Sequence, residues 1–218
     1  MKIIQLSHEK LILNQYIKEI RDKEIQKDSI RFRRNLERIG EVFALEISRK
    51  LSYSSLNTQT PLGNAETKVL DDKLVMATIL RAGLPMHQGM LNIYDRAENA
   101  FVSAYRRHHK DGSFEVKVEY ISSPNLDGKV LIICDPMLAT GHSMVHTYKA
   151  LLNKGKPLHT HIACILASTS GVEEIKRKIQ DDNISLWIGA LDEELTAQAY
   201  IVPGLGDAGD LAYGIKEE

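Results

Sequence analysis

Residues 140–143, with the sequence Thr-Gly-His-Ser, have the composition of a phosphate-binding loop. They follow an apolar run over 130–134 that ends at Asp135, and they precede a helical pattern of apolar residues. A buried strand, a loop of small residues and a helix in this order direct unpaired backbone N–H groups and the helix dipole toward an anion. Gly141 lets the backbone approach that anion closely, and two hydroxyl groups add donors. We expect the 5′-phosphate of a sugar phosphate at this position.

Charged side chains follow the predicted strands at the edge where such a loop would lie. Arg81 comes after a strand predicted over 74–80, and Arg106 comes after a strand predicted over 100–105. Ligands of an open parallel sheet bind beyond the carboxyl ends of its strands. The guanidinium group of arginine binds two phosphate oxygens at once. An aspartate at a strand end, such as Asp135, can accept hydrogen bonds from ribose hydroxyls or hold a cation that is bridged to phosphate. The set suits a substrate with several phosphates and a ribose.

The segment 200–210 is rich in residues that interrupt regular structure, with three glycines, one proline and two aspartates. A loop of this composition presents backbone donors and acceptors to its surroundings. A flexible terminus is the alternative interpretation. The aromatic residues Tyr200 and Tyr213 at either side favour a loop that is held against the body of the protein.

The elements that must position these groups alternate between strands and helices. Continuous apolar runs predict buried strands over 74–80, 100–105, 130–134, 159–166 and 184–188. Helices are predicted over 84–91, from 144 onward, and over 170–180, the last with Ser170 as its cap and Glu173 three residues on. This alternation predicts a parallel sheet covered on both faces. The period-two pattern over 114–120 predicts an exposed hairpin arm.

Two helices are predicted ahead of the sheet. The first has an apolar stripe between His8 and Arg21, and the second runs from its N-cap, Asp28, to Leu51. The second helix also carries four arginines, Arg31, Arg33, Arg34 and Arg38. We interpret them as a solvated or partner-facing surface, with an anion patch as the alternative. Residues 52–63 are polar, which predicts a loop or an irregular pair of strands.

Composition and charge narrow the class of protein. The 218 residues are 43% hydrophobic and include 28 basic and 29 acidic side chains. This balance argues against a general binder of nucleic acid or of membrane surfaces. We find no apolar run of membrane-spanning length, and the first residues do not have the pattern of a signal peptide. Cys134 and Cys164 lie in apolar runs, which predicts buried free thiols in a reducing cytoplasm.

Four motifs resemble the signatures of the uracil phosphoribosyltransferases. They are Ile-Leu-Arg-Ala-Gly over 79–83, Tyr105 with Arg106, Cys-Asp-Pro-Met-Leu-Ala-Thr-Gly-His-Ser over 134–143, and Ile-Val-Pro-Gly-Leu-Gly-Asp-Ala-Gly-Asp over 201–210. The N-terminal helices match in placement, so the resemblance covers essentially the whole chain. It implies an α/β fold, the type I phosphoribosyltransferase fold, in a single domain over 1–218. That domain would have a helical segment over 1–60, a Rossmann-like parallel-sheet core over 70–190, and a small hood containing the β-arm and a uracil-binding loop over 191–218.

The resemblance also implies a reaction. Uracil would react with 5-phospho-α-D-ribose 1-diphosphate (PRPP) to give UMP and diphosphate in pyrimidine salvage, with Mg²⁺ bound mainly through PRPP. The implied catalytic residues are Arg81, Arg106, Asp135 and Asp207. Arg81 and Arg106 would bind the diphosphate end, and Asp135 the ribose hydroxyls. PRPP would also be bound by Asp207, Pro136, Met137, Leu138, Ala139, Thr140, Gly141, His142 and Ser143. Uracil would be bound by Ile201, Gly206, Asp207 and Ala208.

The family further implies a homodimer or a higher homo-oligomer with the N-terminal helices as its interface, GTP as a candidate effector, and a cytoplasmic location. Neither a nucleic acid nor a membrane is expected as a partner. One alternative is a pyrimidine-sensing RNA-binding regulator on the same fold, which only the arginines over 31–38 favour. Another is a catalytically silent regulatory subunit, which is disfavoured because the four implied catalytic residues, Arg81, Arg106, Asp135 and Asp207, are intact.

Three features depart from the family pattern, and one of them, Leu211 in place of a basic residue after Asp210, carries no functional conclusion. His142 stands where glycine is usual, so an imidazole must fit at the phosphate loop. The run over 107–110 is basic, and a solvated turn is favoured over an additional diphosphate clamp. Zinc was also considered, because His142 with His146, and His159 with His161, have chelating spacings. Neither pair has a third ligand nearby in sequence, so we predict no metal site.

Overall fold

The computed structural model describes residues 1–108 and 114–216, and for residues 104–108 and 114–118 only the backbone is described. Within this part of the chain a seven-stranded sheet has the order β1 (Lys2–Gln5), β9 (Ile184–Asp192), β8 (His159–Ser168), β7 (Val130–Leu138), β4 (Leu74–Leu80), β5 (Glu98–His108) and β6 (Phe114–Ser122). Neighbouring strands are parallel except for the antiparallel pair of β5 and β6. The predicted parallel sheet and its hairpin arm are therefore confirmed, whereas the short edge strand β1 was not foreseen.

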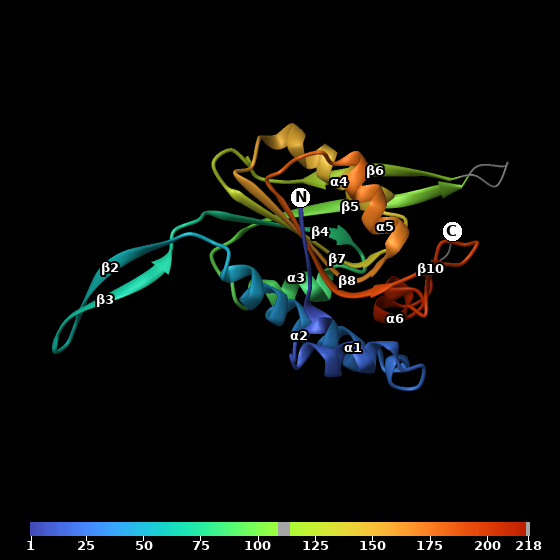
Figure 1. Ribbon diagram of the computed structural model, residues 1–218, viewed down its shortest axis with the longest axis horizontal. Coiled ribbons are helices and arrows are strands. Elements are labelled where there is room, and N and C mark those ends of the chain that lie inside the picture. Colours follow the sequence, from blue (N-terminus) through green and yellow to red (C-terminus); the bar gives the residue numbers. More distant parts are fainter. Residues whose placement is uncertain (109–113, 217–218) are drawn as a thin grey trace.

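Helices cover both faces of this sheet (Figure 1). On one face lie α1 (Leu13–Arg21), α2 (Ser29–Ser48) and α3 (Leu84–Leu91), and on the other lie α4 (His142–Leu151) and α5 (Thr169–Lys178). Successive side chains of β4 alternate between two cores: Met76 packs with the first group of helices, and Val75 and Ala77 pack with the second. Burial on both faces explains why the strands appear in the sequence as unbroken apolar runs.

The long helix α2 is held by a continuous apolar stripe. Phe32, Leu36, Ile39, Phe43 and Ile47 are all buried, as predicted from their spacing. Full burial of such a side chain contributes about 1.5–3 kcal/mol. Asp28 caps the helix as predicted, with its carboxylate accepting from the N–H groups of Ile30 at 3.0 Å and Arg31 at 3.1 Å. Three short 3₁₀ turns complete the helical part: η1 (Leu6–His8), η2 (Ile25–Lys27) and η3 (Leu152–Lys154).

Several sequence-based boundaries differ from the structure, and two of these lie beside the predicted phosphate loop. The central strand does not end at Asp135, because β7 keeps its parallel pairing with β8 through Leu138. Helix α5 is capped by Ser168 rather than Ser170: the Ser168 backbone is extended, and its hydroxyl accepts from the N–H of Gly171 at 2.9 Å. Ser170 already lies within the helix, where it cannot act as the cap.

Residues 52–63 are not an irregular segment. They belong to a regular antiparallel hairpin of β2 (Tyr53–Thr60) and β3 (Gly63–Leu70), which projects from the body (Figure 1). Nearly every residue of the hairpin is exposed, so it lacks the alternation of buried and exposed side chains by which a strand is usually recognised. Two small strands, β10 (Glu194–Leu195) and β11 (Ile201–Val202), and the helix α6 (Ala208–Tyr213) complete the described chain.

The arginines of α2 make contacts within the chain. Arg31 pairs with Glu19 at 3.0 Å and Arg34 with Glu37 at 2.6 Å, although both arginines are exposed. Arg33 donates to the carbonyl oxygen of Ala212 at 2.6 Å. Arg31 and Arg33 therefore join α2 to α1 and α6, while Arg34 pairs within α2, which favours neither a purely solvated surface nor an anion patch.

Cys134 and Cys164 are free and buried, as expected. Within the described residues we found no helix with the length and apolar composition needed to cross a membrane.

Candidate active site

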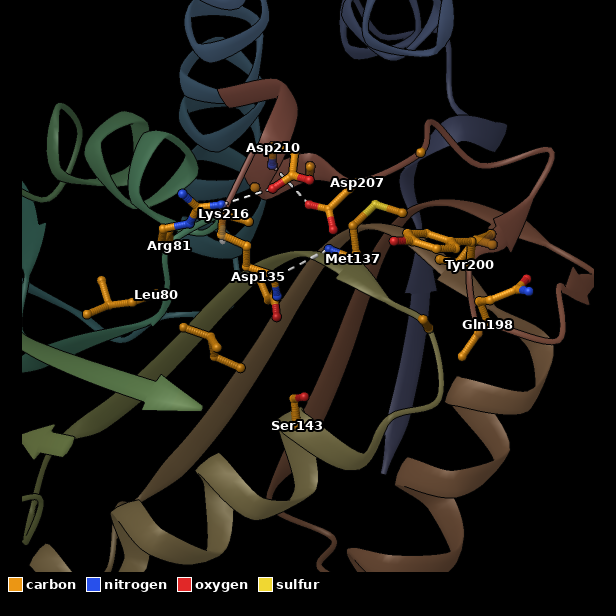
Figure 2. A pocket seen from close by; sticks show the side chains of 18 of the residues that line it. Leu80, Arg81, Asp135, Met137, Ser143, Gln198, Tyr200, Asp207, Asp210 and Lys216 are labelled. Carbon is orange, nitrogen blue, oxygen red and sulfur yellow. Dashed lines mark hydrogen bonds and ion pairs between the residues drawn. The ribbon is translucent and has the colours of Figure 1, made fainter. Parts of the chain in front are cut away.

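A cavity of about 760 Å³ opens at the carboxyl ends of β4 and β7, within the size range of small-molecule sites. The C-terminal segment lies across it (Figure 2). Most of its walls come from three parts of the chain: residues 79–82 at the end of β4, residues 135–143 of β7 and the following loop, and residues 198–210. Ser103 and Lys216 complete the lining. The three parts contain three of the four sequence motifs, so segments that are far apart in the sequence meet around one space.

The structure brings most of the predicted site residues to this cavity. The lining includes Arg81, Asp135, Met137, Ala139, Ser143, Ile201, Gly206, Asp207 and Ala208. The loop residues Thr140, Gly141 and His142 lie between two of these lining residues in sequence. Leu138 packs into the core on the side of α4 and α5, which leaves its backbone as the part that can reach a ligand. Arg106 is in β5 opposite Val116, and its side chain lies outside the described residues, as do the side chains of the basic run over 107–110.

The phosphate loop ends in a left-handed glycine. Gly141 has φ of 79° and occupies the N-cap position of α4, and no described side chain caps this helix. A Cβ at this position would come within 2.8 Å of the carbonyl oxygen of Gly171. A helix that starts after a glycine has no N-cap side chain, and the strand–loop–helix order at this point favours an anion at the start of α4.

Helix α5 supports this loop from behind, which the sequence did not suggest. The Ser168 hydroxyl donates to the carbonyl oxygen of Ala139 at 2.5 Å while it caps α5. At Gly171 a Cβ would lie 2.4 Å from that same Ala139 oxygen and 2.6 Å from the oxygen of Leu138. Ser168 and Gly171 thus set how closely α5 approaches the phosphate loop. The run Ser-Thr-Ser-Gly over 168–171 was the available signal, but it indicated only a helix start.

His142 fits the loop without strain in the backbone. It is the first residue of α4, so the left-handed conformation falls on Gly141 and not on the histidine. Its Nε2 lies 3.8 Å from Oε1 of Glu174 on α5. Glu174 also pairs with Arg177, which together with the nearby His142 holds the pKa of its carboxyl below the ordinary value. The imidazole therefore has a place beside α5.

Asp135 lies half-buried in the wall of the cavity. Burial raises the pKa of its carboxyl from the ordinary value of 3.8 to about 7, although an N–H from Met137 at 3.3 Å opposes that rise. A carboxyl in this situation accepts added hydrogen-bond donors or a nearby cation readily, because either one stabilises its ionised form.

Arg81 is paired with a carboxylate that the sequence motifs left without a role. Its Nη2 lies 3.0 Å from Oδ1 of Asp210 and donates to the carbonyl oxygen of Gly214 at 3.3 Å. Asp207 in turn caps α6 by accepting from the N–H of Asp210 at 3.0 Å. Figure 2 shows Arg81, Asp210 and Asp207 as neighbours on one side of the cavity.

The part of the cavity wall expected to contact uracil is formed by the segment 198–208. Ile201 and Ala208 are buried, while Gly206 is exposed and has φ of 94°. Tyr200, which the sequence suggested only as an anchor, lines the cavity and lies beside Met137 (Figure 2). This side therefore offers mainly backbone polar groups and an aromatic ring.

Among the described residues there is no group of three or more histidine, cysteine, aspartate or glutamate side chains arranged to hold a metal ion. His161 instead accepts a hydrogen bond from the Trp187 indole at 3.1 Å. Burial lowers the pKa of its imidazole to about 3.

A mostly parallel α/β sheet with a left-handed glycine in the loop after its central strand, a carboxylate three residues before the end of that strand and an arginine after the neighbouring strand is the arrangement of a type I phosphoribosyltransferase. Comparison with known proteins gives the family. A sequence model of the family described as uracil phosphoribosyltransferase matches residues 7–215, so the chain belongs to the uracil phosphoribosyltransferase family.

Individual relatives agree with this assignment. A uracil phosphoribosyltransferase of Porphyromonas gingivalis is 56% identical over 216 residues, which are 99% of this chain and 100% of that protein. One from Methanothermobacter thermautotrophicus is 37% identical over 94% of this chain and 92% of its own. Among solved structures, the AQ2163 protein of Aquifex aeolicus superposes with a TM-score of 0.87 at 28% identity, over 98% of each chain. None of these findings supports the RNA-binding alternative.

Proposed function

We propose that this chain transfers the phosphoribosyl group of PRPP to uracil and releases UMP and diphosphate. The observation that carries the proposal is the shared cavity: Arg81, Asp135 and Ser143 line the same space as the backbone of 201–208. A single substrate pair can therefore reach the phosphate loop, the Asp135 carboxyl and the base loop together.

The phosphate and ribose ends of PRPP are assigned to β7 and the loop that follows it. The N–H groups at the start of α4 and the Ser143 hydroxyl receive the 5′-phosphate. Asp135 accepts hydrogen bonds from the ribose hydroxyls, which stabilise its ionised form against the effect of burial. The anomeric carbon then lies between the base loop and the arginine side of the cavity.

Glycosyl transfer needs stabilisation of the departing diphosphate more than it needs a nucleophilic side chain. The bond from C1′ to the diphosphate oxygen breaks, a bond from C1′ to N1 of uracil forms, and N1 loses its proton. Arg81 meets the charge that develops on the diphosphate. Because Arg81 is paired with Asp210, the incoming diphosphate must compete with that carboxylate for the guanidinium. Arg106 is assigned to the same end of PRPP by its motif.

Magnesium fits this site as an ion held mainly by the substrate. Asp135 is a half-buried carboxyl whose elevated pKa a cation would lower, and it stands near the place assigned to the ribose. When bound, Mg²⁺ would neutralise part of the diphosphate charge. The chain's own contribution is a carboxylate oriented by the Met137 N–H.

Uracil recognition is assigned to the backbone at Ile201, Gly206 and Ala208, with Asp207 toward the ribosyl side. Uracil offers acceptors and a donor along one edge, and fixed backbone groups can match that pattern. Cytosine, with its amino group, would leave some of them unpaired. Sites built on such hydrogen bonds discriminate by roughly 10⁴ or more.

A homodimer or a higher homo-oligomer is part of the proposal. The hairpin of β2 and β3 fits a second copy of the chain, because an isolated two-stranded hairpin is only marginally stable in water. It also exposes Leu56 and Leu62, with 53% and 101% of their surface accessible.

The N-terminal helices were the interface expected from the family, and sedimentation velocity of the purified chain tests the assembly itself. GTP as an effector and the cytoplasmic location stay predictions.

Diphosphate release measured with a panel of bases tests the proposed function. Purified protein, PRPP and Mg²⁺ should release diphosphate with uracil, and far less with cytosine, hypoxanthine, xanthine or orotate. Turnover with a purine base and none with uracil would overturn the proposal.

A further inference from the structure

Arg21 and Asp192 form a partly buried ion pair outside the cavity. Arg21 is the last residue of α1 and Asp192 the last of β9. The guanidinium meets the carboxylate through two parallel hydrogen bonds, Nη1 to Oδ2 at 2.7 Å and Nη2 to Oδ1 at 2.8 Å. The two side chains are 21% and 7% exposed. Neither residue is among those that line the cavity, so the chemistry described above gives the pair no role.

Both members of the pair also hold the backbone of Gly204. Arg21 Nη1 donates to the Gly204 carbonyl oxygen at 3.0 Å, and the Gly204 N–H donates to Asp192 Oδ2 at 3.0 Å. Gly204 is buried with φ of 53°, and a Cβ there would lie 2.0 Å from the carbonyl oxygen of Ile201. Its conformation is thus fixed between Ile201 and Gly206, two of the residues whose backbone is assigned to uracil.

Two further side chains from the N-terminal helices hold the same segment. With its amide nitrogen turned toward two carbonyl oxygens, Gln26 donates to Ile20 at 2.8 Å and to Leu205 at 2.9 Å. Arg33 donates to the carbonyl oxygen of Ala212, at the other end of the base loop. Side chains of the N-terminal helical segment therefore donate hydrogen bonds to the backbone of the C-terminal segment on both sides of residues 206–208.

We propose that Arg21 and Asp192 are positioning residues for base recognition. They hold Gly204 by its N–H and its C=O, so that the backbone at Gly206 and Ala208 keeps the geometry that matches the uracil edge. The inference rests on the proposed function. A pair that served only to join α1 to β9 would not need to bond both polar groups of one loop residue.

The experiment measures KM for uracil and KM for PRPP separately in Arg21→Lys, Asp192→Asn and Arg31→Lys. Arg21→Lys keeps the charge and removes the planar fork that reaches Asp192 and Gly204 together. Arg31→Lys is the matched control, because Arg31 of α2 makes a comparable two-bond pair with Glu19 of α1, at 3.0 Å for each bond. Neither bond involves the C-terminal loop. Thermal unfolding is recorded for each variant.

Arg21→Lys should raise KM for uracil by about tenfold, the effect of losing one charge-assisted hydrogen bond, and change KM for PRPP by less than about twofold. Asp192→Asn should act in the same direction, and Arg31→Lys should change neither constant. The uracil-to-cytosine preference should fall in both pair variants.

Three outcomes overturn the inference. The first is an unchanged KM for uracil in a folded Arg21→Lys variant, and the second is an equal rise in both constants. If Arg21→Lys does not fold, Asp192→Asn decides by the same criteria. The third is a wild-type chain that does not use uracil. This result would overturn the proposed function as well, and it can be told apart from the other two because it is seen in the wild type alone.

Discussion

The two ends of the cavity are built in different ways. The phosphate end is local in sequence: β7, the loop over 139–141 and α4 follow one another directly, and the left-handed Gly141 joins the loop to the helix. The base end is assembled from distant parts, because the segment 201–208 is held by Arg21 and Asp192. A binding site can therefore be predicted from the sequence where the residues that support it are neighbours in the chain. It is much harder to predict where the supporting residues are distant in sequence.

The largest effects should come from residues between the two ends. Asp207→Ala removes the cap of α6 and a cavity-lining carboxylate, and Arg81→Ala removes the cation assigned to the diphosphate. We expect either change to lower kcat/KM by about 10²–10³, the usual scale for losing one group that stabilises developing charge. Diphosphate release checks the rate, and circular dichroism checks that the fold is retained. Full activity in Asp207→Ala would show that the C-terminal loop is wrongly assigned.

Changes behind the phosphate loop should affect only the phosphate end. Ser168→Ala removes the hydrogen bond to the Ala139 oxygen and the cap of α5, which costs about 1 kcal/mol of stability. We expect KM for PRPP to rise by about fivefold while KM for uracil stays within about twofold. This outcome is the mirror image of that expected for Arg21→Lys. Equal rises in both constants would mean that the two ends are coupled and would remove the contrast between them.

The pH dependence should report on Asp135. The carboxylate form accepts the ribose hydroxyls, so kcat/KM for PRPP should rise with pH through about 7. Stability has the opposite sign: the neutral carboxyl is favoured in the folded chain, so its contribution is present below about pH 4 and is lost as pH rises to about 7.

Asp135→Asn provides the comparison for both measurements. The variant should lose the rise in activity near pH 7, and its melting temperature should improve relative to the wild type as pH increases from 4 to 7. Thermal melts across this range and initial rates at each pH check the prediction. An identical pH profile in variant and wild type would assign the titration to another group.

The smallest effect should come from His142→Gly. The imidazole lies beside Glu174, and the left-handed conformation is already supplied by Gly141. We expect KM for PRPP to change by less than about threefold, with a loss of stability on the order of 1 kcal/mol from glycine in the first turn of a helix. A tenfold rise in KM for PRPP would instead make the imidazole a direct phosphate ligand.

The contrast between the ends also explains what could be predicted from the sequence. The strand over 74–80 and the helix over 84–91 were predicted with the observed bounds, because apolar periodicity is set by burial against the sheet. The positions of Arg81 and Asp135 could be predicted because each directly follows an apolar run that predicts a strand. Ser168, Gly171 and Asp210 were missed, since a supporting role depends on tertiary contacts that leave no local pattern.

Other misses have equally physical causes. The apolar run stops at the polar residue Asp135, so the predicted strand ended there. In the structure β7 continues its pairing with β8 to Leu138, and Asp135 and Met137 are its half-buried positions. The hairpin of β2 and β3 has no buried face, and a strand without one resembles a loop in sequence. The Arg21–Asp192 pair joins residues 171 positions apart, which no spacing rule connects.

A crystal structure with bound UMP would test the whole assignment at once, because UMP carries both a 5′-phosphate and the base. The account predicts that the phosphate lies at the N–H groups of residues 141–143 at the start of α4, and that the uracil edge meets the backbone at Gly206 and Ala208. Arg21 and Asp192 should still hold Gly204. A phosphate bound away from α4, or a base that contacts side chains in place of this backbone, would contradict it.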